Sequence, residues 1–355
     1  MQYSTFAAID IGSYDVILEI FEISKKQGIR SVDKICHRME LGKDTYTLGK
    51  IRPEMEEELC RVLADFVRIM EDYRVDDYRA TASSAISEAS NSLYVLGKIH
   101  QLTGLSVTVL SNSEQRFLSY KALAAMEDNF NKIIEKGTAI LDLDGGSFQI
   151  SLFDKDALVT TQNIRMGSLR IRERLAGIQS ETEHYEEMVE ELIWNEVSSF
   201  KKMYLKDRKI ENIMLIGDVF TDSVYQNIEE KTTKIISREN FNTWYEKIIR
   251  QSPMELAVKL GIPLENASLM YPSAVIYKCL IDMMGAEHIW IPGVHMTRGI
   301  AYEYAEQMKL LKGGHNFEND ILMAAKNIGK RYAVNRPHVQ NLEMTALAMF
   351  DATKK

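Results

Sequence analysis

Two short stretches of the chain share one pattern of apolar and polar positions. Residues 140–154 read ILDLDGGSFQISLFD, and residues 8–21 read AIDIGSYDVILEIF. Apolar runs on either side of a tight turn predict a strand, a turn and a returning strand in each case. Asp10 and Asp142 stand at the mouths of the two turns and lie 132 residues apart, about the length of one domain. The sequence therefore predicts two similar domains whose hairpin turns face a shared cleft.

The rest of the chain alternates between helical and extended patterns. Residues 53–73 carry apolar residues at helical spacing, with Pro53 at the start of the helix. We also expect helices over 114–125, 182–200, 272–284 and 298–311, and strands over 28–42, 78–80, 105–110, 158–164, 212–217 and 288–292. Hairpins followed by strand–helix units indicate an α/β protein. No G-x-G-x-x-G motif opens a helix after a strand, so a dinucleotide-binding fold is excluded.

A polar segment separates the two predicted domains. Residues 126–138 are mostly polar and include Gly137, which favours a boundary at this place. We therefore expect a first domain, a second domain and a helical tail over residues 1–128, 129–312 and 313–355.

Composition and charge narrow the function classes. The chain of 355 residues has 45% hydrophobic and 26% charged residues, which is ordinary for a soluble globular protein. Its net charge of −8 argues against a general nucleic-acid binder, although a small anion could still bind locally. The three cysteines are widely spaced, so we expect neither a disulfide framework nor a metal cluster. No leader and no membrane-length apolar run is visible, and we expect a soluble cytoplasmic protein without membrane partners.

Ordered motifs over residues 5–310 resemble those of the Ppx/GppA family of exopolyphosphatases and guanosine pentaphosphate phosphohydrolases. AAIDIGSYDVIL is similar to the family's first phosphate loop, D-hydrophobic-G-S-N-S, and ILDLDGGSFQI is similar to its second, D-I-G-G-G-S-T-E. ATASSAISEASN resembles A-T-x-A-L-R-E-A-x-N, and LSNSEQRFLSY resembles I-S-G-x-E-E-A-R-L. RMGSLRIRERL, NIMLIGD and PSAVIYKCLIDMMGAEHIWIPGVHMTRGIAYE follow in the expected order.

The resemblance implies a fold and an activity. The family belongs to the actin, sugar-kinase and Hsp70 superfamily, so we expect two ribonuclease H-like α/β domains around a central cleft, with a short C-terminal helical segment. The helix at 298–311 is expected to return to the first domain. The implied reaction is Mg²⁺-dependent hydrolysis of terminal phosphoanhydride bonds in polyphosphate or guanosine pentaphosphate.

The resemblance also implies roles for individual residues. Backbone N–H groups of glycine turns surround phosphate oxygens in such sites. The matching positions are Gly12, Ser13, Tyr14, Ser87, Gly145, Gly146, Ser147 and Gly217 for phosphate, Asp10, Asp142 and Asp144 for the metal, and Glu114, Gln115 and Gln149 for catalysis. Asp144 is equally explained as an ordinary turn residue.

The chain departs from the family pattern where the chemistry occurs. The family's catalytic glutamate falls on Gln115, and the carboxylate that ends its second loop falls on Gln149. A glutamine amide cannot accept a proton at neutral pH, and loss of a general base typically costs about 10²–10⁴-fold in rate. The two glutamines are either remnants beside an unused cleft or part of a changed site. Glu114, one position away, could replace the lost base.

The charged residues near the predicted phosphate-binding turns also oppose the binding of an anion. The family's phosphate-binding arginine falls on Ser87, while Asp15, Asp144 and Asp218 add carboxylates near the turns. At an effective dielectric of ~20, a carboxylate ~4 Å from a phosphate charge opposes binding by about 4 kcal/mol unless a metal intervenes.

Three functions follow from these observations. The first is a phosphohydrolase of the Ppx/GppA type, with altered substrate or a displaced base. The second is a non-catalytic relative that binds a phosphate chain, a nucleotide or a protein partner and acts as a regulator. The third is a sugar or acid kinase, which needs an adenosine pocket and finds little support in the turn at residues 217–221.

The tail resembles the start of the HD-like helical domain of longer exopolyphosphatases. Amphipathic patterns occur at 321–332 and 339–350, and the matching residues are Arg331, Tyr332, His338, Phe350 and Asp351. The tail is then either a shortened domain or a vestigial helical hairpin. Its apolar faces need cover, so we expect it to dock on the core or on another subunit, as in a homodimer.

Overall fold

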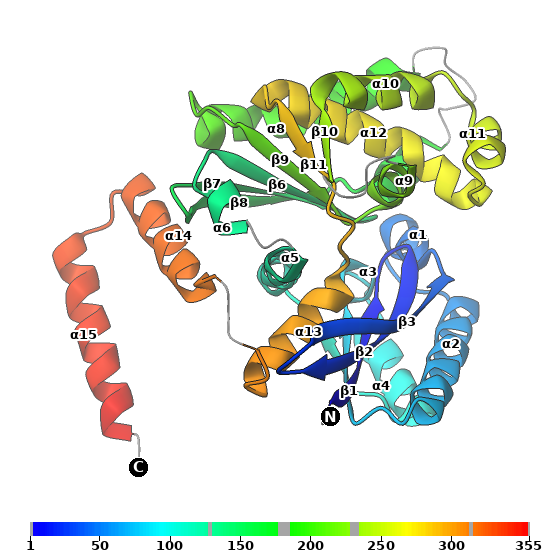
Figure 1. Ribbon diagram of the computed structural model, residues 1–355, viewed down its shortest axis with the longest axis horizontal. Coiled ribbons are helices and arrows are strands. Elements are labelled where there is room, and N and C mark those ends of the chain that lie inside the picture. Colours follow the sequence, from blue (N-terminus) through cyan, green and yellow to red (C-terminus); the bar gives the residue numbers. More distant parts are fainter. Residues whose placement is uncertain (1–2, 127–129, 177–184, 228–233, 312–314, 354–355) are drawn as a thin grey trace.

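Two mixed β-sheets form the framework of the computed structural model, which describes residues 3–126, 130–176, 185–227, 234–311 and 315–353. They lie in the two lobes of Figure 1. The first has the order β3-β2-β1-β4-β5, and its strands are β1 Ser4–Ile11, β2 Asp15–Ser24, β3 Gly28–Arg38, β4 Asp77–Ala82 and β5 Val107–Val109. The second has the order β10-β11-β9-β6-β7-β8, and its strands are β6 Thr138–Leu143, β7 Phe148–Asp154, β8 Ala157–Ile164, β9 Asn212–Ile216, β10 Ile235–Ser237 and β11 His288–Trp290. The predicted α/β class is confirmed.

Both predicted hairpins are present, and they occupy equivalent places in the two sheets. β1 pairs antiparallel with β2 and parallel with β4, just as β6 pairs antiparallel with β7 and parallel with β9. Asp10 lies opposite Ile17, and Asp142 lies opposite Gln149. The same offset of residue numbers relates both members of these pairs, so the internal repeat of the sequence is a repeat of structure.

Alternation along the central strands decides which side chains face inward. Ala7, Ile9 and Ile11 of β1 belong to the core under α2 (Pro53–Asp72) and α4 (Ser92–Thr103). The even-numbered residues point to the opposite face of the sheet, because successive strand residues alternate. Asp10 therefore shares the inner face of its sheet, and the same rule puts Asp142 beside Ile140 on the inner face of the second.

Two helices lie between the sheets (Figure 1). α13 (Met296–Gln307) packs on the inner face of the first sheet, where Tyr304 stacks on Phe6. α5 (Asn112–Met126) packs on the second sheet through Tyr120 and Leu123, and it also packs against α13. The two backbones approach closely, because a Cβ on Gly299 would lie 2.0 Å from the carbonyl oxygen of Leu118.

Most of the remaining helices cover the outer faces and the edges of the sheets, while α6 joins the core on the inner face of the second sheet. Those of the first half are α1 Leu41–Leu48 and α3 Ser84–Ser87. Those of the second half are α6 Phe130–Ile134, α7 Ser168–Leu175, α8 Tyr185–Phe200 with a π-helical turn at Lys201–Leu205, α9 Val219–Asn227, α10 Arg238–Ile249, α11 Pro253–Leu260 and α12 Leu264–Met284.

Several element boundaries differ from the prediction. The helix expected to begin at Pro272 begins at Leu264, and Pro272 lies inside it. A proline inside a helix loses one backbone hydrogen bond, but much of α12 is buried in the second core, and that packing maintains the helix. β5 is shorter than the strand expected at 105–110. The predicted helix at 182–200 is observed from Tyr185, and residues 182–184 lie outside the described part of the chain.

The two helices of the tail differ in their contacts. α14 (Phe317–Arg331) packs against β8, where Asp320 accepts a hydrogen bond from the backbone N–H of Leu158 at 3.2 Å. α15 (Arg336–Thr353) has no buried residue and stands apart from both lobes in Figure 1. Among the described residues, no helix is long and apolar enough to cross a membrane.

Two glycine-to-alanine changes test the close crossing of α5 and α13. Gly299→Ala is expected to lower the free energy of unfolding by ~2 kcal/mol or more, because the new methyl group overlaps Leu118 backbone atoms. Gly97→Ala on α4 meets nothing within 4 Å and is expected to raise the free energy of unfolding by ~0.5–1 kcal/mol. Urea denaturation measures both, and equal effects of the two changes would contradict the crossing.

Candidate functional site

A cavity of about 390 Å³ opens between the two domains where the hairpin turns meet. It is lined by both turns, by α5, by the segment after β9 and by the start of α12. This is the shared cleft that the repeated pattern predicts.

The two turns are closed by the same backbone hydrogen bond. In the first turn, the N–H of Gly12 donates to the carbonyl of Asp15 at 2.9 Å. In the second, the N–H of Asp144 donates to the carbonyl of Ser147 at 2.9 Å. The equivalent positions differ in chemistry, because glycine in the first turn is replaced by a carboxylate in the second. Asp144 also accepts a bond from the N–H of Gly145 at 2.6 Å, which is ordinary turn chemistry.

Helix α5 presents a glutamine to the cleft and turns the neighbouring glutamate away from it. Gln115 is 7% exposed and lines the cavity. Glu114 is exposed and accepts a hydrogen bond from the N–H of Ser111 at 2.8 Å, while Ser111 Oγ accepts one from the N–H of Glu114. This reciprocal pair is a capping box at the start of the helix. Glu114 does not line the cleft, so this geometry gives it no access to a ligand there.

Two buried oxygens in the cleft lack hydrogen-bond donors. Gln149 is 5% exposed, lines the cavity, and its Oε1 has no partner among the described residues. Asp218 accepts bonds at Oδ1 from the N–H of Thr221 at 3.0 Å and from the hydroxyl of Tyr277 at 3.2 Å, but its Oδ2 has no partner either. Unsatisfied buried oxygens of this kind are costly unless a ligand, water or ion satisfies them.

A positive-φ glycine makes room for one of the inner carboxylates. Gly217 has a φ of 104°, and a Cβ there would lie 2.6 Å from Asp142 Oδ1. The other oxygen of Asp142 accepts a hydrogen bond from Ser119 Oγ of α5 at 2.5 Å. Gly217 is thus required for the position of Asp142.

The predicted site residues separate into two groups. Those that line the cleft are Asp10, Gly12, Tyr14, Gln115, Asp142, Asp144, Gly145, Ser147, Gln149 and Gly217. Those outside the lining are Ser13, Ser87, Glu114 and Gly146. Ser87 is exposed, and Ser13 and Gly146 are buried behind the cleft surface.

The pKa values of three cleft carboxylates are raised, so their protonated forms are favoured. Burial, followed by repulsion from Asp15, Asp144 and Asp142, raises the pKa of Asp10 to about 8. Burial is also the largest cause that raises the pKa of Asp144 to about 7 and that of Asp142 to about 6. A divalent cation or a proton relieves this repulsion.

The lining includes charged residues that the motif comparison missed. Asp222 adds a further carboxylate, and Lys34 and Arg38 of β3 add two cations. Lys34, Cys36 and Arg38 alternate along the strand and therefore share one face, a period-2 signal that is visible in the sequence. The signal alone does not show which face meets the cleft, because that depends on the position of the second domain.

The cleft residues fit a magnesium ion that is held mainly by other ligands. Among the described residues, no group of three or more His, Cys, Asp or Glu side chains is placed to hold a metal. Mg²⁺ commonly binds through one or two carboxylates, with water and substrate phosphates completing its shell. Asp10, Asp142 and Asp144 supply hard oxygen donors that repel one another, and the free Oε1 of Gln149 can accept from a metal-bound water.

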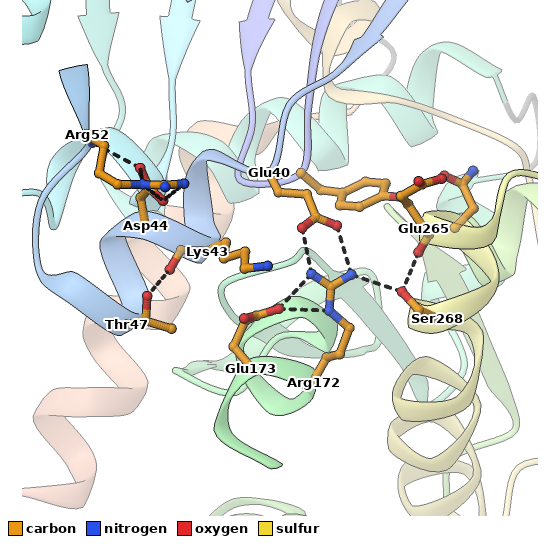
Figure 2. A network of polar contacts seen from close by, with 11 residues as sticks. Glu40, Lys43, Asp44, Thr47, Arg52, Arg172, Glu173, Glu265 and Ser268 are labelled. Atoms are coloured by element: carbon orange, nitrogen blue, oxygen red, sulfur yellow. Dashed lines mark hydrogen bonds and ion pairs between the residues drawn. The ribbon is translucent and has the colours of Figure 1, made fainter. Parts of the chain in front are cut away.

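A network of polar contacts joins the two domains at the edge of the cleft (Figure 2). Arg172 of α7 donates to both carboxylate oxygens of Glu40, at 2.8 and 2.7 Å, and to Ser268 Oγ of α12 at 2.9 Å. Tyr14 donates to Asn266 Oδ1 at 2.7 Å. Glu40 and Tyr14 belong to the first domain, and the other three residues belong to the second. These bonds stabilise the observed arrangement of the two domains.

Several known proteins are similar to this chain in sequence. The model of the Ppx/GppA phosphatase family matches residues 19–308. The chain is 21% identical over 310 residues to the bifunctional 3-dehydroquinate synthase/phosphatase of Fusobacterium nucleatum, covering 80% of this chain and 44% of that protein. It is 19% identical to the guanosine-5'-triphosphate,3'-diphosphate pyrophosphatase of Photobacterium profundum, covering 97% of this chain and 66% of that one. The chain thus spans less than two thirds of either relative.

Solved structures show the same fold. An exopolyphosphatase from Cytophaga hutchinsonii matches with a TM-score of 0.75 and 17% identity, over 86% of this chain and 98% of that one. The Ppx/GppA family member of Aquifex aeolicus matches with a TM-score of 0.70 and 17% identity, over 86% and 99%. These structures confirm the predicted two-domain, actin-like architecture.

The buried carboxylate of Asp218 predicts a pH dependence of stability. Burial raises its pKa to about 7 in the folded protein, against roughly 3.9 in the unfolded chain. Between these values only the folded state keeps the proton, so the free energy of unfolding falls by up to about 1.4 kcal/mol per pH unit as the pH rises. Asp218→Asn is expected to reduce the loss of stability between pH 5 and pH 8 by ~2 kcal/mol.

Urea denaturation at both pH values, in buffer with EDTA, measures this difference. Asp65→Asn is the matched control, because the side chain of Asp65 is 60% exposed. If Asp218→Asn and Asp65→Asn have the same pH profile as the wild type, Asp218 is ionised throughout and the burial argument is wrong.

Proposed function

The chain belongs to the Ppx/GppA phosphatase family, and on that basis we propose that its cleft binds the terminal phosphates of a polyphosphate or guanosine phosphate together with Mg²⁺. We further propose that hydrolysis is lost or very slow, so that the protein acts as a ligand-binding regulator. The family and fold support the ligand class, and the residues of the cleft support the loss of turnover.

The observation that carries this proposal is the pair of buried glutamines. Gln115 and Gln149 both line the cavity, at the two positions where the family pattern has carboxylates. Neither amide can take a proton from an attacking water at neutral pH. Glu114, the nearest glutamate in sequence, is used in the helix cap. The proposed site therefore keeps its means of binding and lacks the family's base.

The remaining residues have a binding role in this proposal. The backbone of Ser147 lines the cleft and can offer its N–H group to a phosphate oxygen, whereas the N–H groups of Gly12 and Gly145 already donate to Asp15 and Asp144. Asp10, Asp142 and Asp144 would hold Mg²⁺, which neutralises phosphate charge when bound. Without the cation these carboxylates repel the phosphate chain, so binding should depend strongly on Mg²⁺.

One observation favours a second candidate, slow hydrolysis with a different base. Asp144 lines the cleft, and its pKa is raised to about 7. A carboxylate with a pKa near the working pH can act as a general base. In this alternative, activity is lost in Asp144→Asn and does not require the glutamines to be changed.

Restoring the two carboxylates tests the main proposal. We expect the double variant Gln115→Glu with Gln149→Glu to release phosphate from polyphosphate or pppGpp in the presence of Mg²⁺, at a rate at least ~10²-fold above the wild type. The measurement is a phosphate-release assay at high enzyme concentration, with EDTA as the metal-free comparison.

Gln101→Glu is the matched control, since Gln101 is exposed on α4 and far from the chemistry in this proposal. Wild-type turnover that equals the double variant and disappears in Asp144→Asn would favour the second candidate. Ligand-dependent thermal stabilisation of the wild type without turnover would support the binding role.

A further inference from the structure

Two of the predicted phosphate-binding residues are covered by a tyrosine side chain. Ser13 and Gly146 belong to the two facing turns, yet neither lines the cleft. The hydroxyl of Tyr46 lies 2.6 Å from Ser13 Oγ and 2.8 Å from Ser84 Oγ, and these two serine oxygens lie 3.2 Å apart. We call the space between the two hairpin turns the anion cradle; its inner part is bounded by Ser13, Ser84 and Gly146. The aromatic side chain of Tyr46 occupies this inner part.

The space over Gly146 is filled by the same side chain. A Cβ on Gly146 would lie 2.1 Å from the Tyr46 hydroxyl oxygen and 2.8 Å from the ring carbon that carries it. A Cβ on Gly145 would meet its nearest atoms only at 3.2 Å. Tyr46 and Ser84 therefore fill the space beside the Gly146 Cα, and a ligand cannot come close to the backbone from that side.

The three hydroxyl groups form a ring that needs no further partner. Each hydroxyl has one proton to donate and can accept at least one bond. Ser13, Tyr46 and Ser84 are mutually within hydrogen-bond distance, so each can donate to one neighbour and accept from the other. In that arrangement the three protons are shared within the ring, although a hydrogen bond from Ser13 to the Asp144 carboxylate also acts to lower the pKa of Asp144.

Helix α1 holds Tyr46 in this position from one side. The N–H of Gly42 donates to the carbonyl of Ser13 at 2.8 Å, which joins α1 to the first turn. A Cβ on Gly42 would lie 2.6 Å from the Tyr46 ring, so the helix and the ring are in close contact.

The second domain holds the ring from the other side. The guanidinium of Arg170 lies 3.8 Å from the centre of the Tyr46 ring, a distance typical of a cation–π contact. Arg170 also donates to the carbonyl of Gly146 at 2.8 Å and pairs with Glu88 at 3.0 Å. Its charge is thus engaged by the ring, a carbonyl and a carboxylate.

We infer that Tyr46 closes the inner part of the anion cradle and so determines how deeply a phosphate chain can enter the cleft. This inference rests on the proposed function, because it concerns the same ligand class. The leading phosphate stops at the outer part lined by Gly12, Gly145 and Ser147. Tyr46 is in this sense a specificity-determining residue that limits the number of contacts available to the terminal phosphate.

Removing the side chain should extend the cradle. Tyr46→Ala is expected to bind tripolyphosphate roughly tenfold more tightly than the wild type at fixed Mg²⁺, because the ligand gains the hydroxyls of Ser13 and Ser84 and the backbone of Gly146. Tyr46→Phe keeps the ring and should stay within about twofold of the wild type. Isothermal titration calorimetry of the full chain measures all three, and Tyr94→Ala, a change at a residue that is 64% exposed on α4, is the matched control.

The outcomes separate this inference from the proposed function. Tighter binding by Tyr46→Ala supports the inference, even if the wild type binds too weakly to measure and the proposed function fails. Equal or weaker binding by Tyr46→Ala, or no binding by either protein, overturns the inference. Should Tyr46→Ala not fold, the phenylalanine variant decides, because a tenfold loss in Tyr46→Phe would identify the hydroxyl as a ligand contact, whereas unchanged binding supports the closed cradle.

Discussion

The repulsion among carboxylates at the centre of the cleft is the constraint on which the rest of the structure depends. Asp10 and Asp142 are the next-to-last residues of the central strands β1 and β6, and Asp144 follows in the second turn. Closing the domains brings these charges together, which is unfavourable without a cation or protons. The bidentate pair of Arg172 with Glu40 acts in the opposite sense, because it favours closure. The two effects oppose each other at the boundary between the domains, and in the proposed function a bound cation would remove the unfavourable one.

Much of the fold can be predicted from local features of the sequence. The two hairpins are visible because apolar runs flank short turns, and their offset of 132 residues is kept in the paired strands. Alternation puts Asp10 with Ala8 and Asp142 with Ile140 on one face of each sheet, and the packing of α13 and α5 makes it the inner face. Pro272 was misleading because burial of α12 outweighs the local preference of proline for a helix start.

The site was harder to predict, because it depends on where individual side chains point, and the motifs do not give this. Glu114 and Gln115 are neighbours in sequence, yet successive helix residues point about 100° apart, and only Gln115 faces the cleft. Ser13 and Gly146 match phosphate loops, but Tyr46 covers them from a helix that the motif comparison did not consider. Lys34 and Arg38 line a cavity only because residues of the second domain, such as Asp222, form its other wall. Such contacts are set by packing between distant segments.

The central claim is that the wild-type cleft binds a phosphate chain with Mg²⁺ and does not hydrolyse it. ³¹P nuclear magnetic resonance of tripolyphosphate with the protein reads both properties in one sample. The account predicts that the phosphate resonances shift or broaden when Mg²⁺ and protein are both present, that EDTA reverses this effect, and that no orthophosphate signal grows. Orthophosphate that accumulates at a catalytic rate, or a spectrum that the protein leaves unchanged, would contradict it.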